Sequence, residues 1–369
     1  MESSFLSVDR PGLFRSQAWL LAWLKAWADH PEVHFFDKHT LVDMNESSLR
    51  ELNLHSRIFN INEPLFSFFP VLSAYPFGVS SKRTPSIRSE YFQFGGDHSH
   101  NANICMDYFN DALTAKWDRL IFPDVLVDSA DYKNIVAAAR LQKLSVVKGT
   151  NEHTYGVNVK SSDFQSYVKE LGKNTRLKLF NSRKRLEQYG EVKVENIWPD
   201  RERFFNLLNT FHSSRWGKPC YRGRNEVFIN TLLDELPGIG AKIDFSVMTI
   251  DDVPVSVAFD IFLNGRIYNL QSGYTEDFAK GIALGTLHLG YQIEAAFDNN
   301  DVEYYDLMAG RGKNSNYKKS LSNGHAEFVT LILVRNRILS LAYRVNARIK
   351  KTIYTLAELG IFSFAEFCF

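Results

Sequence analysis

Cysteine is scarce in this chain, and long apolar runs are missing near its start. The 369 residues include 3 cysteines, too few for a disulfide framework or a CxxC zinc site. The longest apolar run near the N-terminus, residues 18–24, ends at Lys25 and falls far short of the ~20 residues that a membrane-spanning helix needs. Acidic Glu2 and Asp9 precede this run and no small-residue cleavage site follows it, which argues against a secretory signal peptide. We therefore expect a protein of the reducing cytoplasm.

An excess of charge of either sign is also missing. The chain has 43 Lys and Arg residues against 42 Asp and Glu residues, a formal net charge of +1. DNA binding is not expected without a basic field over the whole surface, and any contact with nucleic acid would need a local patch. Hydrophobic residues make up 45% and aromatic residues 14%. This composition is typical of a soluble globular protein with large cores and with aromatic side chains left for a cleft.

The order of the expected elements indicates a mixed α/β fold. Residues 61–160 are predicted to alternate between strands at 65–74, 90–94, 120–127, 145–148 and 155–159 and helices at 104–116 and 131–142. Residues 161–332 are predicted to form helices at 163–171, 174–189, 200–215, 225–236 and 283–297, and strands at 192–197, 242–250, 255–263, 266–274, 302–307 and 326–333. Such alternation is typical of sheets flanked by helices.

Four units follow from this order. Residues 1–60 contain one amphipathic helix, 13–28, in which Trp19, Trp23 and Trp27 form an i, i+4, i+8 row. We expect this helix to pack on the first domain, and the alternative for its tryptophan row is a membrane or partner contact. Two α/β domains follow at 61–160 and 161–332, with a cleft between them. Residues 333–369 form a basic tail with a C-terminal helix.

Two helical stretches are rich in basic residues. Residues 333–351 include six basic residues and no acidic one. This tail either docks on its own domain with a solvated basic side or contacts an acidic partner or the inner face of the cytoplasmic membrane. The stretch from Lys173 to Gln188 includes six basic residues against one acidic residue. It is either a solvated helix face or a rim that attracts a polyanionic acceptor, such as a nucleotide sugar, a lipid diphosphate or tRNA.

The most informative stretch is 255–318. A hairpin of two long strands leads into a loop punctuated by glycine, and the loop opens directly into a helix. The unpaired N–H groups and the positive dipole end at such a helix start suit a phosphate. The small residues Gly281, Ala283 and Gly285 would let a pyrophosphate approach the backbone, although small residues at a helix start also serve ordinary packing.

An ordered series of motifs surrounds this loop. Arg215-Trp216 closes a helix before a polar loop, and the strand pair at 254–262, the YNLQSGY strand at 268–274 and the loop at 277–285 follow. The series ends with Tyr305-Asp306-Leu307, then Gly310 and Tyr317-Lys318. Over about residues 160–325, and more weakly over 60–159, the sequence resembles the cellulose-biosynthesis (CelD-type) acyltransferases, a FemAB-like branch of the GNAT superfamily.

The resemblance implies two GNAT-like domains side by side, each a mixed sheet flanked by helices. It implies an N-acyltransferase that moves an acyl group from acyl-CoA, most simply acetyl-CoA, to an amine. The acceptor implied is an amino sugar of exopolysaccharide or envelope synthesis, either a small molecule or a lipid-linked sugar. The loop with Lys280, Gly281, Ala283 and Gly285 would bind the donor. Where the superfamily has Gln or Arg at the start of this loop, the chain has Phe278, and Lys280 would supply the charge.

Acyl transfer from a thioester needs few protein groups, because the donor is already activated. A base must deprotonate the acceptor ammonium, and Asp260, Tyr274 and Asp306 are the candidates. Tyr317 would protonate the leaving thiolate. Arg215, Trp216 and Lys318 would bind substrate. Each of these residues also has an ordinary structural interpretation, as a turn cap, a core tyrosine, a structural ion pair or a surface lysine.

Two other functions remain open at this stage. One is an aminoacyl-tRNA-dependent transferase of the FemAB kind, although no sustained heptad run predicts the coiled-coil arm common in those proteins. The other is a GNAT-like scaffold without catalysis, docked to a polysaccharide synthase by its tail. A metal is not expected, because His98 and His100 beside Asp97 fit a polar, glycine-flanked turn and no third ligand group stands out.

Overall fold

The computed structural model describes residues 12–35, 44, 48–49, 54–65, 69–94, 101–310 and 313–346. Its helices are α1 (Gln17–Trp27), α4 (Asn101–Thr114), α5 (Ala130–Leu141), α6 (Phe164–Glu170), α7 (Lys173–Arg176), α8 (Arg183–Leu186), α9 (Arg201–Trp216), α10 (Arg224–Glu235), α11 (Leu284–Asp298) and α12 (Lys313–Leu321). Its strands are β1 (Ile58–Leu65), β2 (Phe69–Pro76), β3 (Arg119–Leu126), β4 (Ser145–Asn158), β5 (Val192–Asn196), β6 (Lys242–Ile250), β7 (Val253–Leu263), β8 (Arg266–Tyr274), β9 (Tyr304–Gly310) and β10 (Gly324–Val334). Residues 337–346 form a further helical segment.

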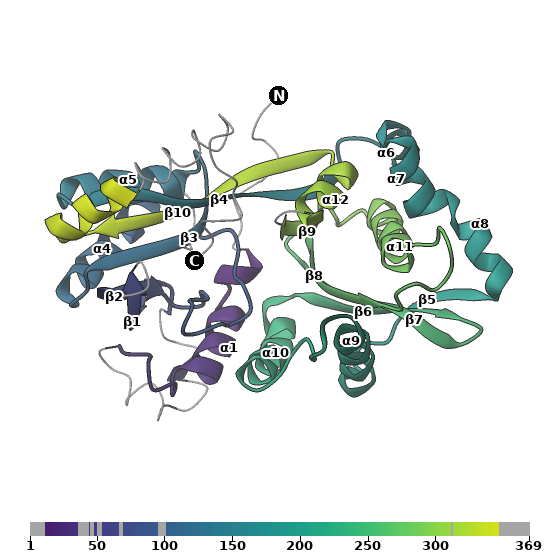
Figure 1. Cartoon of the computed structure of the whole chain (residues 1–369), viewed down its shortest axis with the longest axis horizontal. Coiled ribbons are helices and arrows are strands. Elements are labelled where there is room, and N and C mark those ends of the chain that lie inside the picture. Colours follow the sequence, from purple (N-terminus) through teal and green to yellow (C-terminus); the bar gives the residue numbers. More distant parts are fainter. Residues whose placement is uncertain are drawn as a thin grey trace, which may run out of the picture.

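A mixed sheet runs through the described part of the chain, with helices on both faces (Figure 1). Its strand order is β1-β2-β3-β10-β4-β9-β8-β7-β6-β5. The mixed α/β class expected from the sequence is therefore confirmed. The two sheets expected on either side of residue 160 are hydrogen-bonded edge to edge through β4. The last strand, β10, crosses back from the second unit and lies between β3 and β4.

The junction between the two halves is a short stretch of β4. Residues 153–156 of β4 pair with β10 on one edge and with β9 on the other. Gly156 stands at this point, and a Cβ atom there would overlap the Tyr304 side chain. Only glycine lets β4 and β9 approach this closely. The bulge in β9 described below lies directly opposite this junction.

Helix α1 belongs to both halves. Ser16 caps it by accepting from the Trp19 backbone N–H, and Trp19 and Trp23 are fully buried. The Trp19 indole donates to the Gly78 carbonyl at 2.9 Å, and the Trp19 ring lies edge-on to Phe228 of α10 at 4.8 Å. The tryptophan row expected to pack on the first domain therefore also binds the second half, which fixes the two halves relative to each other.

The second half has the layer arrangement that its strand pattern requires. Alternate residues of β6 face opposite sides: Phe245 and Val247 join the core under α9 and α10, whereas Met248 and Ile250 pack against α8 and the start of α11. In Figure 1, α9 and α10 lie on one side of β6 and β7, and α11 lies on the other. Helices α4 and α5 pack on the first half.

Five local expectations differ from the structure. The single strand expected at 65–74 falls on two antiparallel strands, β1, which ends at Leu65, and β2, which begins at Phe69. The strand expected at 90–94 is irregular, because Tyr91 has a left-handed φ of 54° and the Phe92 N–H bonds to Asp124 outside a regular ladder. The strands expected at 145–148 and 155–159 are one strand, β4. The helix expected at 174–189 is broken by a π-helical segment, Leu177–Asn181. Helix α12 was not expected, because its sequence shows no apolar periodicity.

Candidate active site

The candidate site lies where two parallel strands separate. β8 and β9 pair at three positions only, from Arg266 with Tyr304 to Tyr268 with Asp306. Beyond these pairs the strands diverge, and a cavity of about 650 Å³ opens there. Its walls come from α9, β7, β8, the start of α11, the end of β9, α12 and the segment that contains Arg88 and Glu90. An elongated ligand that enters between the strands would find backbone groups of β8 that β9 does not bond.

Bulges in both diverging strands shape the cavity. In β8, Gln271 pairs with Phe259 and Asn269 pairs with Asp260, which leaves Leu270 as an extra residue. In β9, the register shifts between Asp306 and Ala309, and Met308 between them has a left-handed φ of 63°. Bulges bend strands and redirect backbone groups, and they are frequent next to active sites. Here both bulges lie on the cavity wall.

The start of α11 forms the donor side of the cavity. Ala283 stands at the N-cap position of this 15-residue helix without a side-chain cap. The Thr286 N–H donates to the Ala283 carbonyl at 3.0 Å, so the N–H groups of Leu284 and Gly285 are the ones available to a ligand. Gly285 and Thr286 line the cavity. A Cβ atom on Gly285 would overlap the Tyr274 ring, which therefore rests directly on the helix. This end suits an anionic group.

The loop before α11 is braced from outside the cavity. The Lys280 carbonyl accepts from Arg185 of α8 at 3.0 Å, and the same guanidinium lies beside Gly281, whose φ is 77°. Lys280, Gly281 and Ala283 do not line the cavity, whereas Gly285 does. Of the predicted donor-binding residues, the structure places one on the wall and three in the adjoining loop.

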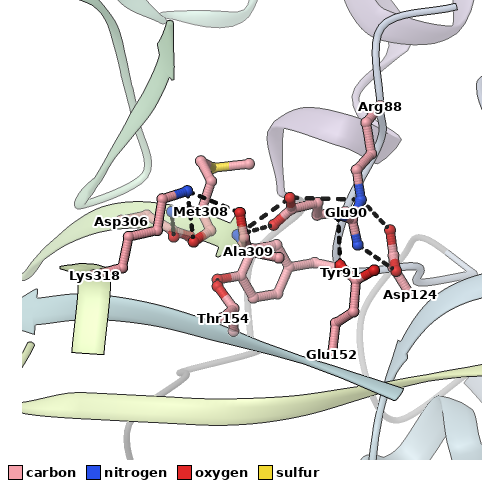
Figure 2. Close-up of polar contacts among 10 residues, drawn as sticks. All are labelled: Arg88, Glu90, Tyr91, Asp124, Glu152, Thr154, Asp306, Met308, Ala309 and Lys318. Atoms are coloured by element: carbon pink, nitrogen blue, oxygen red, sulfur yellow. Dashed lines mark hydrogen bonds and ion pairs between the residues drawn. The ribbon is translucent and has the colours of Figure 1, made fainter. Parts of the chain in front are cut away.

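A polar network forms the opposite wall, with Glu90 buried and Arg88 exposed (Figure 2). The Ala309 backbone lies at its centre: its N–H donates to the Glu90 carboxylate at 3.0 Å, and its carbonyl accepts from Lys318 Nζ at 2.8 Å. Arg88 also lines the cavity, lies 3.7 Å from the Glu90 carboxylate and donates twice to Asp124, each time at 2.8 Å. Arg88 also pairs with Glu152 at 2.7 Å. The network holds one carboxylate, one amine and one guanidinium at the cavity, and the end of β9 fixes the first two.

Glu90 is the titratable group best suited to accept a proton here. It is 4% exposed and lines the cavity. Burial raises the pKa of Glu90 to about 7, with Asp306 and Asp124 adding to the rise and Arg88 opposing it. Burial lowers the pKa of Lys318. A carboxyl group with a pKa near neutrality is a candidate general base.

Two of the predicted catalytic carboxylates lie away from this cavity. Asp306 is fully buried and accepts from the Met308 N–H at 2.7 Å, and its other oxygen faces Arg266 at 3.6 Å. It therefore stabilises the β9 bulge. Asp260 lines a second cavity of about 200 Å³, where it accepts from Tyr305 and Asn269, each at 2.6 Å. Burial, with Asp244 adding to it, raises the pKa of Asp260 to about 7.

The remaining predicted residues meet at the cavity. Tyr274, Tyr317, Arg215, Trp216 and Lys318 all line it. Tyr274 accepts from Arg215 at 2.6 Å, and burial raises the pKa of the Tyr317 phenol, which keeps it protonated. The Trp216 side chain is 60% exposed at the rim, with the Arg215 guanidinium 5.0 Å from its ring centre. This rim offers a flat aromatic face and a cation to an incoming ligand.

Sequence analysis missed Arg88 and Glu90. It assigned 90–94 to a strand, and the residue type alone gave the carboxylate at the start of that strand no special role. The signal was an acidic residue directly before the aromatic run YFQF, which predicts burial of the neighbouring backbone. Within the described ranges, no group of three or more His, Cys, Asp and Glu side chains is placed to hold a metal ion. His98 and His100 lie outside the described residues.

Comparison with known proteins agrees with this geometry. Residues 173–319 match the family described as an acetyltransferase (GNAT) domain. This segment is a GNAT acetyltransferase domain. It contains α11, the diverging strands β8 and β9, and the start of the network at Lys318, so the chain is an acyltransferase. The GNAT part of the resemblance found in the sequence is confirmed.

A likeness in fold to one solved structure reaches beyond this segment. The crystal structure of FemX shares 15% identity over 77% of this chain and 85% of its own, with a TM-score of 0.50. The C-terminal domain of a lysylphosphatidylglycerol synthetase from Agrobacterium fabrum shares 10% identity over 91% of this chain and 93% of its own, with a TM-score of 0.49. A tandem GNAT protein of clavulanic acid biosynthesis shares 11% identity over 85% of this chain and 93% of its own, with a TM-score of 0.41. No curated protein matches the sequence.

Proposed function

We propose that this chain transfers an acyl group from acyl-CoA, with acetyl-CoA as the simplest donor, to the amine of an amino sugar used in exopolysaccharide or envelope synthesis. The observation that carries the proposal is the position of Glu90. A buried carboxyl group with a pKa of about 7 faces the cavity between diverging strands, opposite the start of α11. An N-acyltransferase needs a proton acceptor at this place.

The donor would bind along the α11 side. Its pantetheine arm would enter between β8 and β9, where the strands no longer pair, and bond the β8 backbone as an added strand does. Its phosphates would lie toward the start of α11 beside Gly285. The cavity volume of about 650 Å³ suits the arm, the acyl group and part of an acceptor.

The reaction needs one base and one acid. The Glu90 carboxylate removes a proton from the acceptor ammonium, and the free amine attacks the thioester carbonyl to form the C–N bond. As the tetrahedral intermediate collapses, the C–S bond breaks. Tyr317 gives its proton to the leaving thiolate and regains one from the nitrogen. Tyr317 lines the cavity, and its raised pKa keeps that proton available.

The acceptor would bind at the opposite rim. Exposed Trp216 offers a face on which a sugar ring stacks, and Arg215 offers a cation for a phosphate or carboxylate. Arg215 is already paired with Glu276 at 3.1 Å, so an anionic acceptor would compete with that carboxylate. This competition favours acceptors with two negative charges, such as nucleotide sugars.

The C-terminal helical segment supports a peripheral location at the inner face of the cytoplasmic membrane. Ile338, Leu341 and Val345 recur on one side of it and are 79%, 59% and 45% exposed. Arg337 and Arg344 belong to the same segment. Arg335 instead stabilises the fold. Its guanidinium lies 4.0 Å from the centre of the Trp117 ring and donates to two backbone carbonyls. An apolar stripe with neighbouring cations suits an anionic lipid surface.

The test is thiol release. The protein is incubated with acetyl-CoA and either glucosamine, UDP-glucosamine or no amine, and free thiol and the acylated product are measured. We expect amine-dependent thiol release, with the product acylated on nitrogen. If acetyl-CoA fails to bind in calorimetry and no amine is acylated, the proposed donor is wrong. If an aminoacyl-tRNA acylates the amine in the same assay, the donor is aminoacyl-tRNA and not acyl-CoA.

A further inference from the structure

Exposed cations line the broken helical segment before the GNAT core. Lys173, Lys178, Lys184 and Arg185 are exposed along α7, the π-helical segment and α8, and we call these four residues the basic ridge. Glu187 is the acidic residue of that segment. Arg183, between them in sequence, points inward instead, where it pairs with Glu294 and lies 3.8 Å from the Tyr291 ring centre. The ridge is therefore a separate outer face.

The basic ridge lies beside the donor loop. Arg185 donates to the Lys280 carbonyl at 3.0 Å, and the Tyr189 and Phe278 rings are 5.3 Å apart. On its inner side, the Leu179 backbone touches Gly290 of α11, where no side chain would fit. Figure 1 shows α7 and α8 running past the start of α11 at the outer edge of the molecule. A partner bound on the ridge would lie at the entrance of the donor channel.

Exposed apolar and aromatic side chains accompany the cations of the ridge. Leu177 is 42% exposed and Tyr189 is 52% exposed on the same segment. Exposed apolar and aromatic side chains among cations are typical of a surface that binds a folded acidic protein. The exposed leucine favours a protein partner, because RNA is bound mainly through cations on its phosphates and aromatic rings on its bases.

We propose that the basic ridge docks an acidic carrier protein that delivers the acyl group as a thioester on a phosphopantetheine arm. This inference rests on the proposed function, because it supplies the same thioester to the same cavity. The arm is the part that such a carrier shares with coenzyme A. The carrier's acidic helix would lie along the ridge, and the arm would pass the donor loop into the gap between β8 and β9. As in the transfer from acetyl-CoA, the C–N bond to the acceptor forms and the thioester C–S bond breaks. The leaving thiolate is then the end of the carrier's arm.

The test compares binding of two donors to two charge-reversed variants. The ridge variant is Lys178→Glu with Lys184→Glu, two exposed lysines without a role in the cavity. The matched control is Lys133→Glu with Arg140→Glu, two exposed cations of α5 in the other half. The probes are a fluorescent bacterial acyl carrier protein with its pantetheine arm, the same protein without the arm, uncharged tRNA, and acetyl-CoA measured by calorimetry.

We expect the unaltered chain to bind the carrier protein, more weakly at high salt. The ridge variant should bind it at least tenfold more weakly, while its affinity for acetyl-CoA and both affinities of the control variant change less than twofold. Binding of acetyl-CoA without binding of the carrier overturns the inference and leaves the proposed function intact. Equal loss of both donors in the ridge variant would make the ridge part of the coenzyme site. Tighter, ridge-dependent binding of tRNA would make it an RNA surface. Failure to bind either thioester donor would remove the proposed function itself.

Discussion

Replacing Glu90 with glutamine should remove the proton acceptor while keeping the wall of the cavity. The glutamine oxygen still accepts from the Ala309 N–H, which Glu90 now accepts at 3.0 Å. The amide cannot take up a proton from the acceptor ammonium. Positioned general bases contribute about 10²- to 10⁴-fold to rate, so we expect kcat/KM to fall by that factor. The fall corresponds to about 3–5 kcal/mol of transition-state stabilisation.

The pH profile separates this role from a structural one. With a pKa of about 7 for Glu90, kcat/KM of the unaltered chain should rise with pH and level off above pH 7, because only the ionised carboxylate accepts a proton. In Glu90→Gln this rise should disappear. Asp260→Asn is the matched control, because burial also raises the pKa of Asp260 to about 7 but the group faces the second cavity.

The assay is thiol release from acetyl-CoA between pH 5.5 and 9, with circular dichroism as the check on folding. Asp260→Asn should keep the rise near pH 7. If Glu90→Gln keeps it, or if Asp260→Asn loses it, Glu90 is not the base. A rise kept equally in both variants, with intact folding, would show that the profile reflects the pKa of the acceptor amine or of another group.

Three further predictions concern the donor side, stability and the tail. Gly285→Ala should push the Tyr274 ring into the cavity and weaken acetyl-CoA binding at least tenfold in calorimetry. Gly238→Ala, at a position with open space around it, should leave the affinity unchanged. Equal affinities of the two variants would contradict the donor assignment. The pKa of Asp260 is higher in the folded chain than in the unfolded chain, so the folded chain binds the extra proton. The free energy of unfolding should therefore decrease as pH rises from about 4 to about 7. In denaturant titrations, the free energy of unfolding of Asp260→Asn should depend less steeply on pH, and an equally steep dependence would refute the buried-acid interpretation. Ile338→Ser with Leu341→Ser should reduce salt-sensitive co-sedimentation with anionic vesicles. Leu141 is 71% exposed on α5, and Leu141→Ser should leave co-sedimentation unchanged. Unchanged vesicle binding of the double variant would show that the tail does not make the membrane contact.

Several elements of both halves follow from local patterns in the sequence. The turn residues Asn264 and Gly265 both take positive φ values, 52° and 83°, as the Asn-Gly signal between β7 and β8 predicts. Ser129 caps α5 by accepting from the Tyr132 N–H, as serine directly before a helix commonly does. Such signals act over a few residues, so they locate elements reliably.

The assembly of the site depends on contacts that local patterns do not contain. β10 lies between β3 and β4, which no property of residues 324–334 alone predicts. Glu90 is held at the cavity because its carboxylate accepts from the backbone N–H of Ala309, 219 residues later in the chain. Asp260 and Asp306 were plausible bases by residue type, but β-strand alternation and the β9 bulge turn them away from the cavity. Burial then gives two distant carboxyl groups, Glu90 and Asp260, the same raised pKa, and only the fold distinguishes them.

A crystal structure of the chain with an unreactive thioether analogue of acetyl-CoA would test most directly whether this cavity is the site of acyl transfer. We predict that the pantetheine arm lies between β8 and β9, with its phosphates at the start of α11. The acyl carbon should face the space between Glu90 and Tyr317. A coenzyme bound elsewhere, such as in the cavity of Asp244 and Asp260 or on the outer surface with the cavity empty, would contradict this assignment.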